Sequence, residues 1–547
     1  MSATTIYSAR KIITMNPNQP EVSHVAVRDG RILAAGSLEE LTGWGDYTLD
    51  ERFAGKVLMP GLIEGHAHSM EGALWSFAYV GLFDRMDPNG KVWSGLKTVD
   101  DVVARLSEIE ETMDDPDEPL LGWGLDPIYM DNVRTTRHDL DRVSSTRPVG
   151  ILHASGHILN VNTKGLELAG LLKSGNNHPG IPLGDDGLPT GELKSPEITM
   201  PAGKHVGMDR AFLAADEMGL RNYARLCVRA GVTTSSDLGQ QLNDELVAMF
   251  DKVTGEPDYP VCLVAFRINI GASPQELVDY TLSLKDRSTD RLELGKIKVV
   301  ADGSIQGFSA RMQWPGYYNG APNGLWYIAP EQLAEIYERS LAAGVQVHTH
   351  TNGDEATQLT IETLEAALRK HPDFDHRFTL QHCQLASEAQ FRKMGRLGMC
   401  VNLFANHHFY WGDQHYALTV GPERANRMNA CRAALDAGVP MTIHSDAPVT
   451  PLGPLFTAGS AATRHTATGR TLGEAQRLSV NEALYAVTMG AAIPMKMDDR
   501  IGSIEVGKRA DFAVLEDDPT DAAPDGLKDV RVWGTVQGGR IFEAASI

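Results

Sequence analysis

The chain has 547 residues, of which 42% are hydrophobic and 22% are charged, and both values are near the average for globular proteins. They exclude a disordered or low-complexity chain, and the length allows one large barrel with an accessory domain. Lysine and arginine total 50 against 71 for aspartate and glutamate, so the formal net charge is −21. Such a chain is a poor electrostatic match for nucleic acid or an anionic membrane, and we expect neither as a partner.

The cysteines and the first residues bear on the cellular compartment. The five cysteines are few, odd in number and form no CxxC pair, which argues against a disulfide framework or a thiolate zinc site. The opening MSATTIYSARKIITMNP has no basic segment followed by an apolar one, and no run of about 18 apolar residues occurs. We therefore expect a cytoplasmic protein with neither a signal peptide nor a membrane span.

Strand-like segments occupy both ends of the chain. Residues 1–60 contain alternating segments around a hairpin turn at Asp29-Gly30, and residues 495–547 repeat this pattern with glycine-rich turns. We expect the two ends to pair into one small, composite, sandwich-like β domain.

Residues 61–494 alternate apolar strands with helical periodicity. About seven or eight strand–helix units predict an α/β fold, a (β/α)8 barrel of the TIM type. A doubly wound open sheet is the rival, but it would be expected to carry a glycine-rich phosphate turn, and none stands at a strand-to-helix junction. Two stretches, near 70–145 and 174–208, look like insertions that cover the mouth of the barrel.

His66 and His68 close the apolar run VLMPGLIEGHAH. Residues two apart on a strand point to the same side, so both imidazoles would face one interior point at the C-terminal end of a barrel strand. Such a pair suits a divalent metal ion. The alternative is a pair of core or surface histidines whose nitrogens are satisfied by hydrogen bonds.

Four later strands also end in a polar group. Lys298, His350, His382 and Asp446 each interrupt an apolar strand at or near its C-terminal end. In a barrel these ends meet at one rim, where imidazoles, a carboxylate and a lysine form a metal site more readily than a packed core.

The chain resembles the amidohydrolase superfamily of metal-dependent hydrolases. More narrowly it is similar to the amidohydrolase 3 branch, which includes the N-substituted formamide deformylases. The resemblance spans nearly the whole chain and keeps the order of the motifs, which are PGLIEGHAH (60–68), SGHILNVNTKGLELAG (155–170), KVVADGS (298–304), HTNGDEA (350–356), LQHCQL (380–385), HSDAPVTP (444–451) and IGSIEVGKRADFAVL (501–515).

The resemblance implies a binuclear centre of two divalent ions. His66, His68 and Asp446 would bind the more buried ion, and His350 and His382 the second. Zinc is the expected metal, with iron, manganese and cobalt left open by the same ligand types.

Lys298 falls where the resemblance implies an N-carboxylated lysine that bridges both ions. An ammonium group would repel two cations, whereas a carbamate supplies a negative charge and two oxygens. Lys296 lies on the same strand face and is the competing candidate. A lysine in a salt bridge is the other alternative.

The resemblance also implies how catalysis would proceed. Metal ions lower the pKa of water, and the resulting hydroxide would attack an N-substituted amide or formamide while Asp446 serves as general base and then general acid. His157 matches a position near the substrate, where an imidazole could hold the carbonyl or the developing oxyanion; a structural histidine is the alternative.

The sequence departs from its relatives at the barrel mouth. Relatives commonly read DGSLGSRTA where this chain has Phe308 in place of the arginine, so this chain lacks the cation that would contact an anion there. The segment NLFANHHFYWGD lacks the usual proline and contains Trp411; it is either a substrate lid or plain packing. We predict Trp123, Phe308 and Trp411 as substrate-binding residues and an uncharged, apolar amide as substrate.

The sequence thus predicts an amidohydrolase that acts on carbon–nitrogen bonds other than peptide bonds of a small molecule. A cyclic amidohydrolase or a deaminase on the same scaffold is the nearest alternative. A different class of alternative is a noncatalytic regulatory protein that binds a metal or ligand. We also expect a homo-oligomer, a dimer, although the sequence does not specify the oligomeric state.

Overall fold

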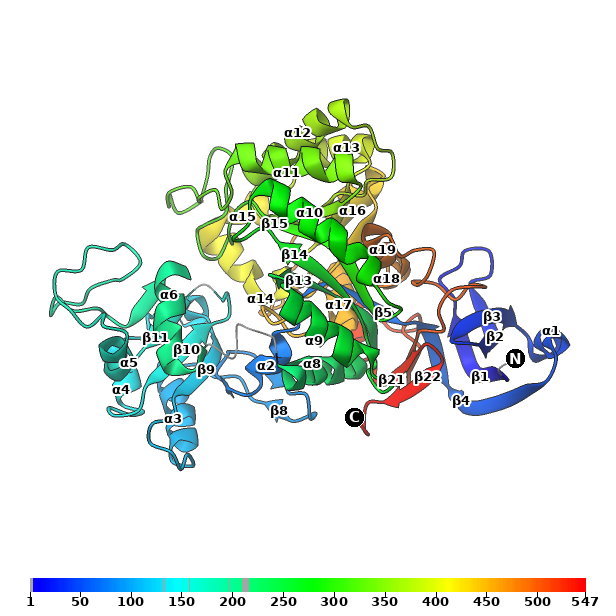
Figure 1. Cartoon of the computed structure of the whole chain (residues 1–547), viewed down its shortest axis with the longest axis horizontal. Helices are drawn as coiled ribbons and strands as arrows, with labels where there is room; N and C mark the ends of the chain where they lie inside the picture. Colours follow the sequence, from blue (N-terminus) through cyan, green and yellow to red (C-terminus); the bar gives the residue numbers. More distant parts are fainter. Residues whose placement is uncertain (1–2, 131–132, 157, 195, 209–215) are drawn as a thin grey trace. The chain divides into compact units, whose positions relative to one another are not determined.

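The computed structural model describes residues 3–130, 133–156, 158–194, 196–208 and 216–547 (Figure 1). The chain divides into two compact units. The first consists of Met1–His68 together with Cys227–Ile547, and the second of Ser69–Leu226. No described helix is long and apolar enough to cross a membrane.

Eight parallel strands form the barrel of the first unit. A bridge between Ala67 and Ala447 links the first strand to the segment after the last, and the Asp446 N–H donates to the His66 carbonyl at 2.9 Å. The predicted TIM-type barrel is therefore confirmed. In spatial order the strands are β5 (Leu62–Ala67), β13 (Val232–Gln240), β14 (Cys262–Ile268), β15 (Leu292–Val300), β16 (Gln346–Thr351), β17 (Thr379–His382), β18 (Cys400–Leu403) and β19 (Met441–Ile443).

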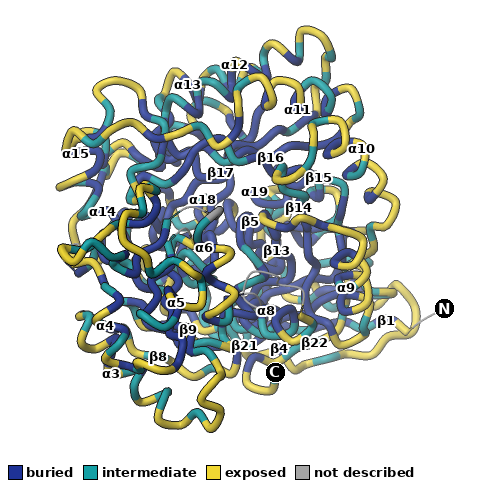
Figure 2. The backbone as a smooth tube through the Cα atoms, turned by 60° about the vertical axis from the view of Figure 1, so that its left-hand side comes forward, coloured by how far each residue is buried: buried dark blue, intermediate teal, exposed yellow. Residues whose placement is uncertain are grey.

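Helices with defined caps connect the barrel strands. Ser273 and Glu276 form a capping box at α10, and Ser387 and Gln390 form one at α13, so each helix begins where its first backbone N–H groups find acceptors. Figure 1 shows α10, α11, α12 and α13 outside the strands, and Figure 2 shows β13 to β17 as mostly buried. The helices are α8 (Glu217–Arg229), α9 (Asp244–Gly255), α10 (Pro274–Leu284), α11 (Pro330–Ala343), α12 (Asp354–Lys370), α13 (Glu388–Leu397), α14 (His407–Gln414), α15 (Gly421–Arg427), α16 (Cys431–Asp436), α17 (Pro454–Thr463), α18 (Val480–Ala486) and α19 (Met489–Ala492).

Both ends of the chain lie in one seven-stranded sheet, as the sequence predicts. Its long strand β4 pairs in parallel with β1 and in antiparallel with β20, and Phe53 and Phe512 are buried in its core. The β2–β3 hairpin turns at Asp29-Gly30, where both residues have positive φ (53° and 72°) as a tight primed turn requires. The strands are β1 (Thr4–Ile13), β2 (Glu21–Arg28), β3 (Arg31–Gly36), β4 (Tyr47–Pro60), β20 (Phe512–Leu515), β21 (Val532–Gln537) and β22 (Arg540–Glu543); the short helix α1 (Leu38–Leu41) follows β3.

The second unit has its own sheet and its own cores, one of which contains Trp123 and Leu193. The stretches expected as two insertions both lie in this unit, joined by β10 and β11 between them. Its strands are β6 (Ala78–Tyr79), β7 (Arg85–Met86), β8 (Val92–Trp93), β9 (Leu120–Leu125), β10 (Val149–His153), β11 (Ile158–Val161) and β12 (Glu192–Lys194), and its helices are α2 (Glu71–Leu74), α3 (Val99–Glu110), α4 (Arg137–Asp141), α5 (Thr163–Leu168) and α6 (Pro196–Gly203).

Candidate metal centre

The centre lies where the barrel strands end. His66 and Asp446 are on the segments that close the barrel, and the Asp446 Oδ1 atom is 3.2 Å from His66 Nε2 and 3.4 Å from His68 Nε2. The other carboxylate oxygen, Oδ2, is 3.9 Å from His382 Nδ1. The ligand atoms of His66, His68 and Asp446 therefore form a compact group of the kind that could hold a metal ion.

The remaining predicted ligands surround this group. The rings of His382 and His66 have centroids 4.5 Å apart, and those of His382 and His350 are also 4.5 Å apart. Lys298 Nζ is 3.5 Å from His66 Nε2. His350 is turned partly away, because its Nδ1 is 3.2 Å from Asp302 Oδ1 and its Nε2 is 3.3 Å from Asn352 Nδ2.

His444, which the sequence analysis did not single out as a ligand, belongs to a second possible metal-binding group. Its ligand atom and those of His66 and His382 lie within 4.8 Å of one another. The only signal in the sequence is the spacing HSD, which puts His444 two residues before Asp446 at the end of a strand.

Glu64 is a second residue that sequence reasoning missed. Its Oε1 accepts the backbone N–H groups of His66 and Ser445, both at 3.2 Å, and its Oε2 is 2.7 Å from Ser445 Oγ. Glu64 thereby joins β5 to the segment that carries Asp446. Burial raises the pKa of Glu64 to about 8. A carboxyl group two residues before His66 in an apolar run was the available signal.

Burial sets the charge state of the side chains in the centre. It lowers the pKa of His66 and of His382 well below the ordinary value, with neighbouring cationic groups acting in the same direction, so both imidazoles are neutral and can offer lone pairs. Burial also lowers the pKa of Lys298 to about 7, against the opposing effect of the Asp446 carboxylate.

The two lysines of β15 differ in their partners. Lys296 Nζ is 3.3 Å from Glu293 Oε1, so this lysine forms an ordinary ion pair. Within the described part of the chain, Lys298 Nζ lies against an imidazole nitrogen and in no such pair. Neutral imidazoles, a carboxylate and a buried lysine that forms no ion pair among the described residues suit the binding of divalent metal ions.

Two candidate ligands have left-handed backbones. His382 has a φ of 66° and Asp446 a φ of 58°, a region that non-glycine residues seldom occupy. Each such residue costs about 1 to 3 kcal/mol and persists where the surrounding structure holds it, typically at functional sites. The positive φ changes the direction of the backbone, and therefore of the side chain, at His382 and at Asp446.

The predicted substrate-binding residues lie in different surroundings. Phe308 is partly buried with its ring centroid 5.2 Å from that of Tyr317, and Trp411 is 2% exposed and stacks on His407 at 4.4 Å. Trp123, in the other unit, packs in a core at 5.1 Å from Trp75. The candidate catalytic residue His157 lies outside the described residues.

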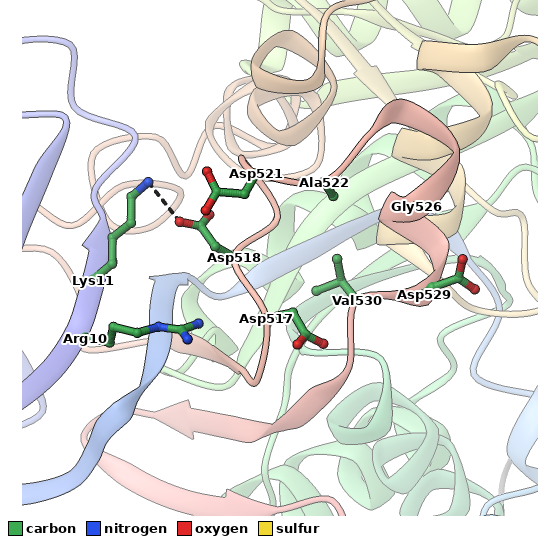
Figure 3. Close-up of a pocket in the computed structure, with 9 residues that line it drawn as sticks. All are labelled: Arg10, Lys11, Asp517, Asp518, Asp521, Ala522, Gly526, Asp529 and Val530. Carbon is green, nitrogen blue, oxygen red and sulfur yellow. Dashed lines mark ion pairs between the residues drawn. The ribbon is translucent and has the colours of Figure 1, made fainter.

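A surface cavity of about 700 Å³ is separate from the barrel strands (Figure 3). Its lining comes from β1 and from residues 517–530. Two of its aspartates are paired, because Lys11 Nζ is 2.9 Å from Asp518 Oδ2 and Arg531 Nη2 is 2.9 Å from Asp517 Oδ1. We assign no ligand to this cavity.

Comparison with known proteins identifies the family. The sequence model of the amidohydrolase family (Amidohydro_3) matches residues 54–542. This chain belongs to the amidohydrolase family. The amidohydrolase is accordingly an enzyme that acts on carbon–nitrogen bonds, and metal dependence accords with its cluster of histidines and aspartate.

Relatives and solved structures resemble this amidohydrolase over most of its length. It is 28% identical to Protein LONG AFTER FAR-RED 3 of Arabidopsis thaliana, over 97% of this chain and 90% of that protein. It is 24% identical to N-substituted formamide deformylase of Arthrobacter pascens, over 93% of each.

Among solved structures, an uncharacterized metal-dependent hydrolase of Pyrococcus horikoshii aligns with a TM-score of 0.73 and 20% identity, over 95% of this chain and 99% of that one. Atrazine chlorohydrolase TrzN of Arthrobacter aurescens, complexed with zinc, aligns with a TM-score of 0.52 and 15% identity, over 98% and 94%. Both alignments reproduce the fold.

Proposed function

We propose that this amidohydrolase hydrolyses an N-substituted amide or formamide of a small, uncharged molecule at a centre of two divalent ions. The observation that carries the proposal is the convergence of imidazole, carboxylate and amine groups from β5, β15, β16, β17 and the segment after β19. Similarity to N-substituted formamide deformylase supports the substrate class, and zinc in TrzN supports zinc as the metal.

In this proposal His66, His68 and Asp446 hold one ion, His350 and His382 hold the other, and a carboxylated Lys298 bridges them. When bound, such ions supply Lewis acidity and lower the pKa of water. For His350 to serve as a ligand, one of its nitrogens must exchange its present neighbour, Asp302 or Asn352, for the metal.

Carboxylation of Lys298 requires a neutral amine. The amine nitrogen adds to the carbon of carbon dioxide and loses one proton, which leaves a carbamate with one negative charge. Burial of Lys298 favours the neutral amine and outweighs the opposing effect of the Asp446 carboxylate, which is not within ion-pair distance of Lys298 among the described residues.

Asp446 is the proposed proton carrier. It accepts a proton from the attacking water and returns it to the departing nitrogen, so that it acts first as base and then as acid. Its position supports this role, because its backbone N–H is bonded to the His66 carbonyl and its carboxylate faces three imidazoles at 3.2 to 3.9 Å.

Metal analysis combined with turnover of a substrate panel tests the proposal. The panel contains N-benzylformamide, a cyclic amide, an aminopurine and an N-formyl amino acid. We expect about two ions per chain and the fastest turnover with N-benzylformamide. Metal without turnover of any compound would overturn the proposed substrate class, and preference for the cyclic amide or the aminopurine would replace the proposed reaction with ring opening or deamination.

A further inference from the structure

Two buried chains of hydrogen bonds run from backbone carbonyls to His66 and His382. We infer that these chains, here called relays, fix the protons of both imidazoles on Nδ1 and so leave each Nε2 with the lone pair that a metal ion needs. The first relay consists of the Pro494 carbonyl, His348, Gln381 and His66, and the second of the Gly65 carbonyl, Asn402, His444 and His382. The inference rests on the proposed metal centre and goes beyond it by assigning four positioning residues.

The direction of the first relay follows from its carbonyl end. The Pro494 carbonyl can only accept, so His348 Nε2, 3.0 Å away, must carry the proton. His348 Nδ1 then has a lone pair and accepts from the Gln381 amide nitrogen at 2.8 Å. This orientation turns Gln381 Oε1 toward His66 Nδ1 at 2.7 Å, and the oxygen requires a proton on that nitrogen. His66 Nε2 is left with a lone pair.

The second relay has the same logic with a different carbonyl. Asn402 Nδ2 donates to the Gly65 carbonyl at 2.8 Å, so Asn402 Oδ1 faces His444 Nδ1 at 2.9 Å and accepts its proton. His444 Nε2 therefore accepts from His382 Nδ1 at 3.0 Å. The His382 Nε2 atom is left with a lone pair.

Burial makes both relays rigid. Gln381, His348, Asn402 and His444 are each at most 1% exposed, so water cannot replace a lost partner. The approach of Asn402 depends on Gly65, because a β-carbon at that position would lie 3.0 Å from Asn402 Nδ2.

The relays also explain why a cation would stabilise the centre. With its proton on Nδ1, His66 directs a lone pair at Asp446 Oδ1, 3.2 Å away, so two acceptors face each other with no hydrogen between them. His66 and Asp446 would both hold a divalent ion, whose positive charge would relieve this unfavourable contact. Ligand histidines in metal sites are generally oriented by an acceptor at their other nitrogen, and loss of that acceptor weakens metal affinity by about 10- to 100-fold.

The first test reads the proton positions directly in the metal-free protein. Full-length chain, ring-15N-labelled at histidine and treated with a chelator, is studied by NMR, with His348→Gln and His444→Gln used for assignment. We expect the Nδ1–H form for His66, His382 and His444 and the Nε2–H form for His348. An Nε2–H form of His66 or His382 would overturn the inference, whether or not the protein proves to be an active enzyme.

The second test separates hydrogen bonding from packing by zinc affinity. Gln381→Leu and Asn402→Leu keep the approximate volume but remove the acceptor, and we expect zinc dissociation constants at least about tenfold higher. Gln381→Glu and Asn402→Asp keep an acceptor toward the imidazole, and we expect values within about threefold of wild type. The relays would be refuted if the leucine and acid variants lost zinc affinity equally, or if the leucine variants kept the zinc affinity of wild type.

Gln390→Leu is the matched control for these variants. Gln390 is also a buried glutamine whose amide donates to a backbone carbonyl, that of Asp354 at 2.8 Å, but it lies on the outer helix α13. We expect a comparable loss of thermal stability and unchanged zinc affinity. His444 could instead be a zinc ligand itself, in the group formed by His66, His382 and His444. In that case His444→Gln would lower the zinc affinity and Asn402→Leu would not. That result would also refute the second relay.

Discussion

At the scale of single residues, the centre depends on where a backbone turns as much as on which side chain it carries. Asp446 reaches the histidines because its φ is 58° and its N–H is bonded to the His66 carbonyl, directly after β19 ends. A sequence can indicate an aspartate at a strand end, but it does not display the left-handed turn, because only a few per cent of non-glycine residues have positive φ even though aspartate and histidine are enriched among them.

The role of Asp446 in proton transfer can be tested by Asp446→Asn. Asparagine has nearly the same shape but cannot accept the proton, so we expect kcat to fall by at least about two orders of magnitude in a protein that remains folded. Steady-state kinetics measures kcat, and circular dichroism shows whether the variant is folded. The exposed Asp525 provides a control, since Asp525→Asn should leave kcat unchanged. A nearly normal kcat in Asp446→Asn would remove Asp446 as the base.

The two lysines of β15 offer a matched pair for the metal bridge. Lys298→Ala should lose most of the bound metal together with activity, because the proposed bridging group is gone. Lys296→Ala should lose only its ion pair with Glu293 and keep the metal. Elemental analysis of the two purified variants gives the comparison. Equal metal content in both variants, or one ion per chain in active wild type, would argue against a bridged pair.

At the scale of elements, the alternation of strands and helices predicted the barrel, and the two strand-rich ends predicted the composite sheet. The second unit was not recognisable as one body, because β10 and β11 join sequence segments that look like separate loops. His444 and Glu64 are not predictable from the ligand pattern, because each contacts a ligand residue from a neighbouring position: His444 contacts the His382 ring, and Glu64 accepts the backbone N–H of His66. Contacts of this kind depend on side-chain orientation across strands, which linear patterns do not encode.

The closure between β5 and the segment after β19 should depend on pH through Glu64. Its pKa in the folded protein, about 8, is above the ordinary value of 4.5, so the folded state holds a proton that the unfolded state releases. The free energy of unfolding should therefore fall as pH rises from about 5 to about 8, by a few kcal/mol at most for a group this buried. Glu64→Gln mimics the protonated form and should flatten this dependence.

Urea unfolding of wild type and Glu64→Gln in chelator, across that range of pH, measures the effect. Glu482→Gln serves as the contrasting variant, because a hydrogen bond to Arg432 lowers the pKa of Glu482 to about 2. Glu482 is therefore ionised throughout the range from pH 5 to 8. Its substitution should leave the pH dependence of the free energy of unfolding in this range as in wild type. An identical slope in wild type and Glu64→Gln would show that Glu64 is ionised in the folded protein.

At the scale of the whole molecule, the net charge of −21 bears on the choice of substrate. A carboxylate-bearing amide is repelled at long range, and Phe308 stands where the resemblance described above implies an arginine that could hold it. A neutral amide meets no such repulsion. The net charge and the expected apolar lining of the substrate site therefore both favour a neutral amide over a carboxylate-bearing one.

We expect kcat/KM for N-benzylformamide to exceed that for an N-formyl amino acid by at least about tenfold at low salt. Raising the salt concentration screens exposed charges and should increase kcat/KM for the acid while leaving that for the neutral amide unchanged. Phe308→Arg should reduce the ratio of kcat/KM for N-benzylformamide to kcat/KM for the N-formyl amino acid. A clear preference of wild type for the acid, or a ratio that salt does not alter, would contradict this account of selectivity.

The composite sheet has a consequence for biosynthesis. Strand β4 pairs with β20, in which Phe512 lies opposite Pro60, so this edge of β4 waits for a partner that leaves the ribosome about 450 residues later. At about 5 to 20 residues per second the wait is roughly 20 to 90 seconds. During that time β4 presents an unpaired strand edge ending in the buried residues Val57 to Pro60, a template for pairing with other nascent chains. Slow translation near the 3′ end of the message should therefore lower the yield of native enzyme, and a chaperone that shields apolar strand edges should restore it.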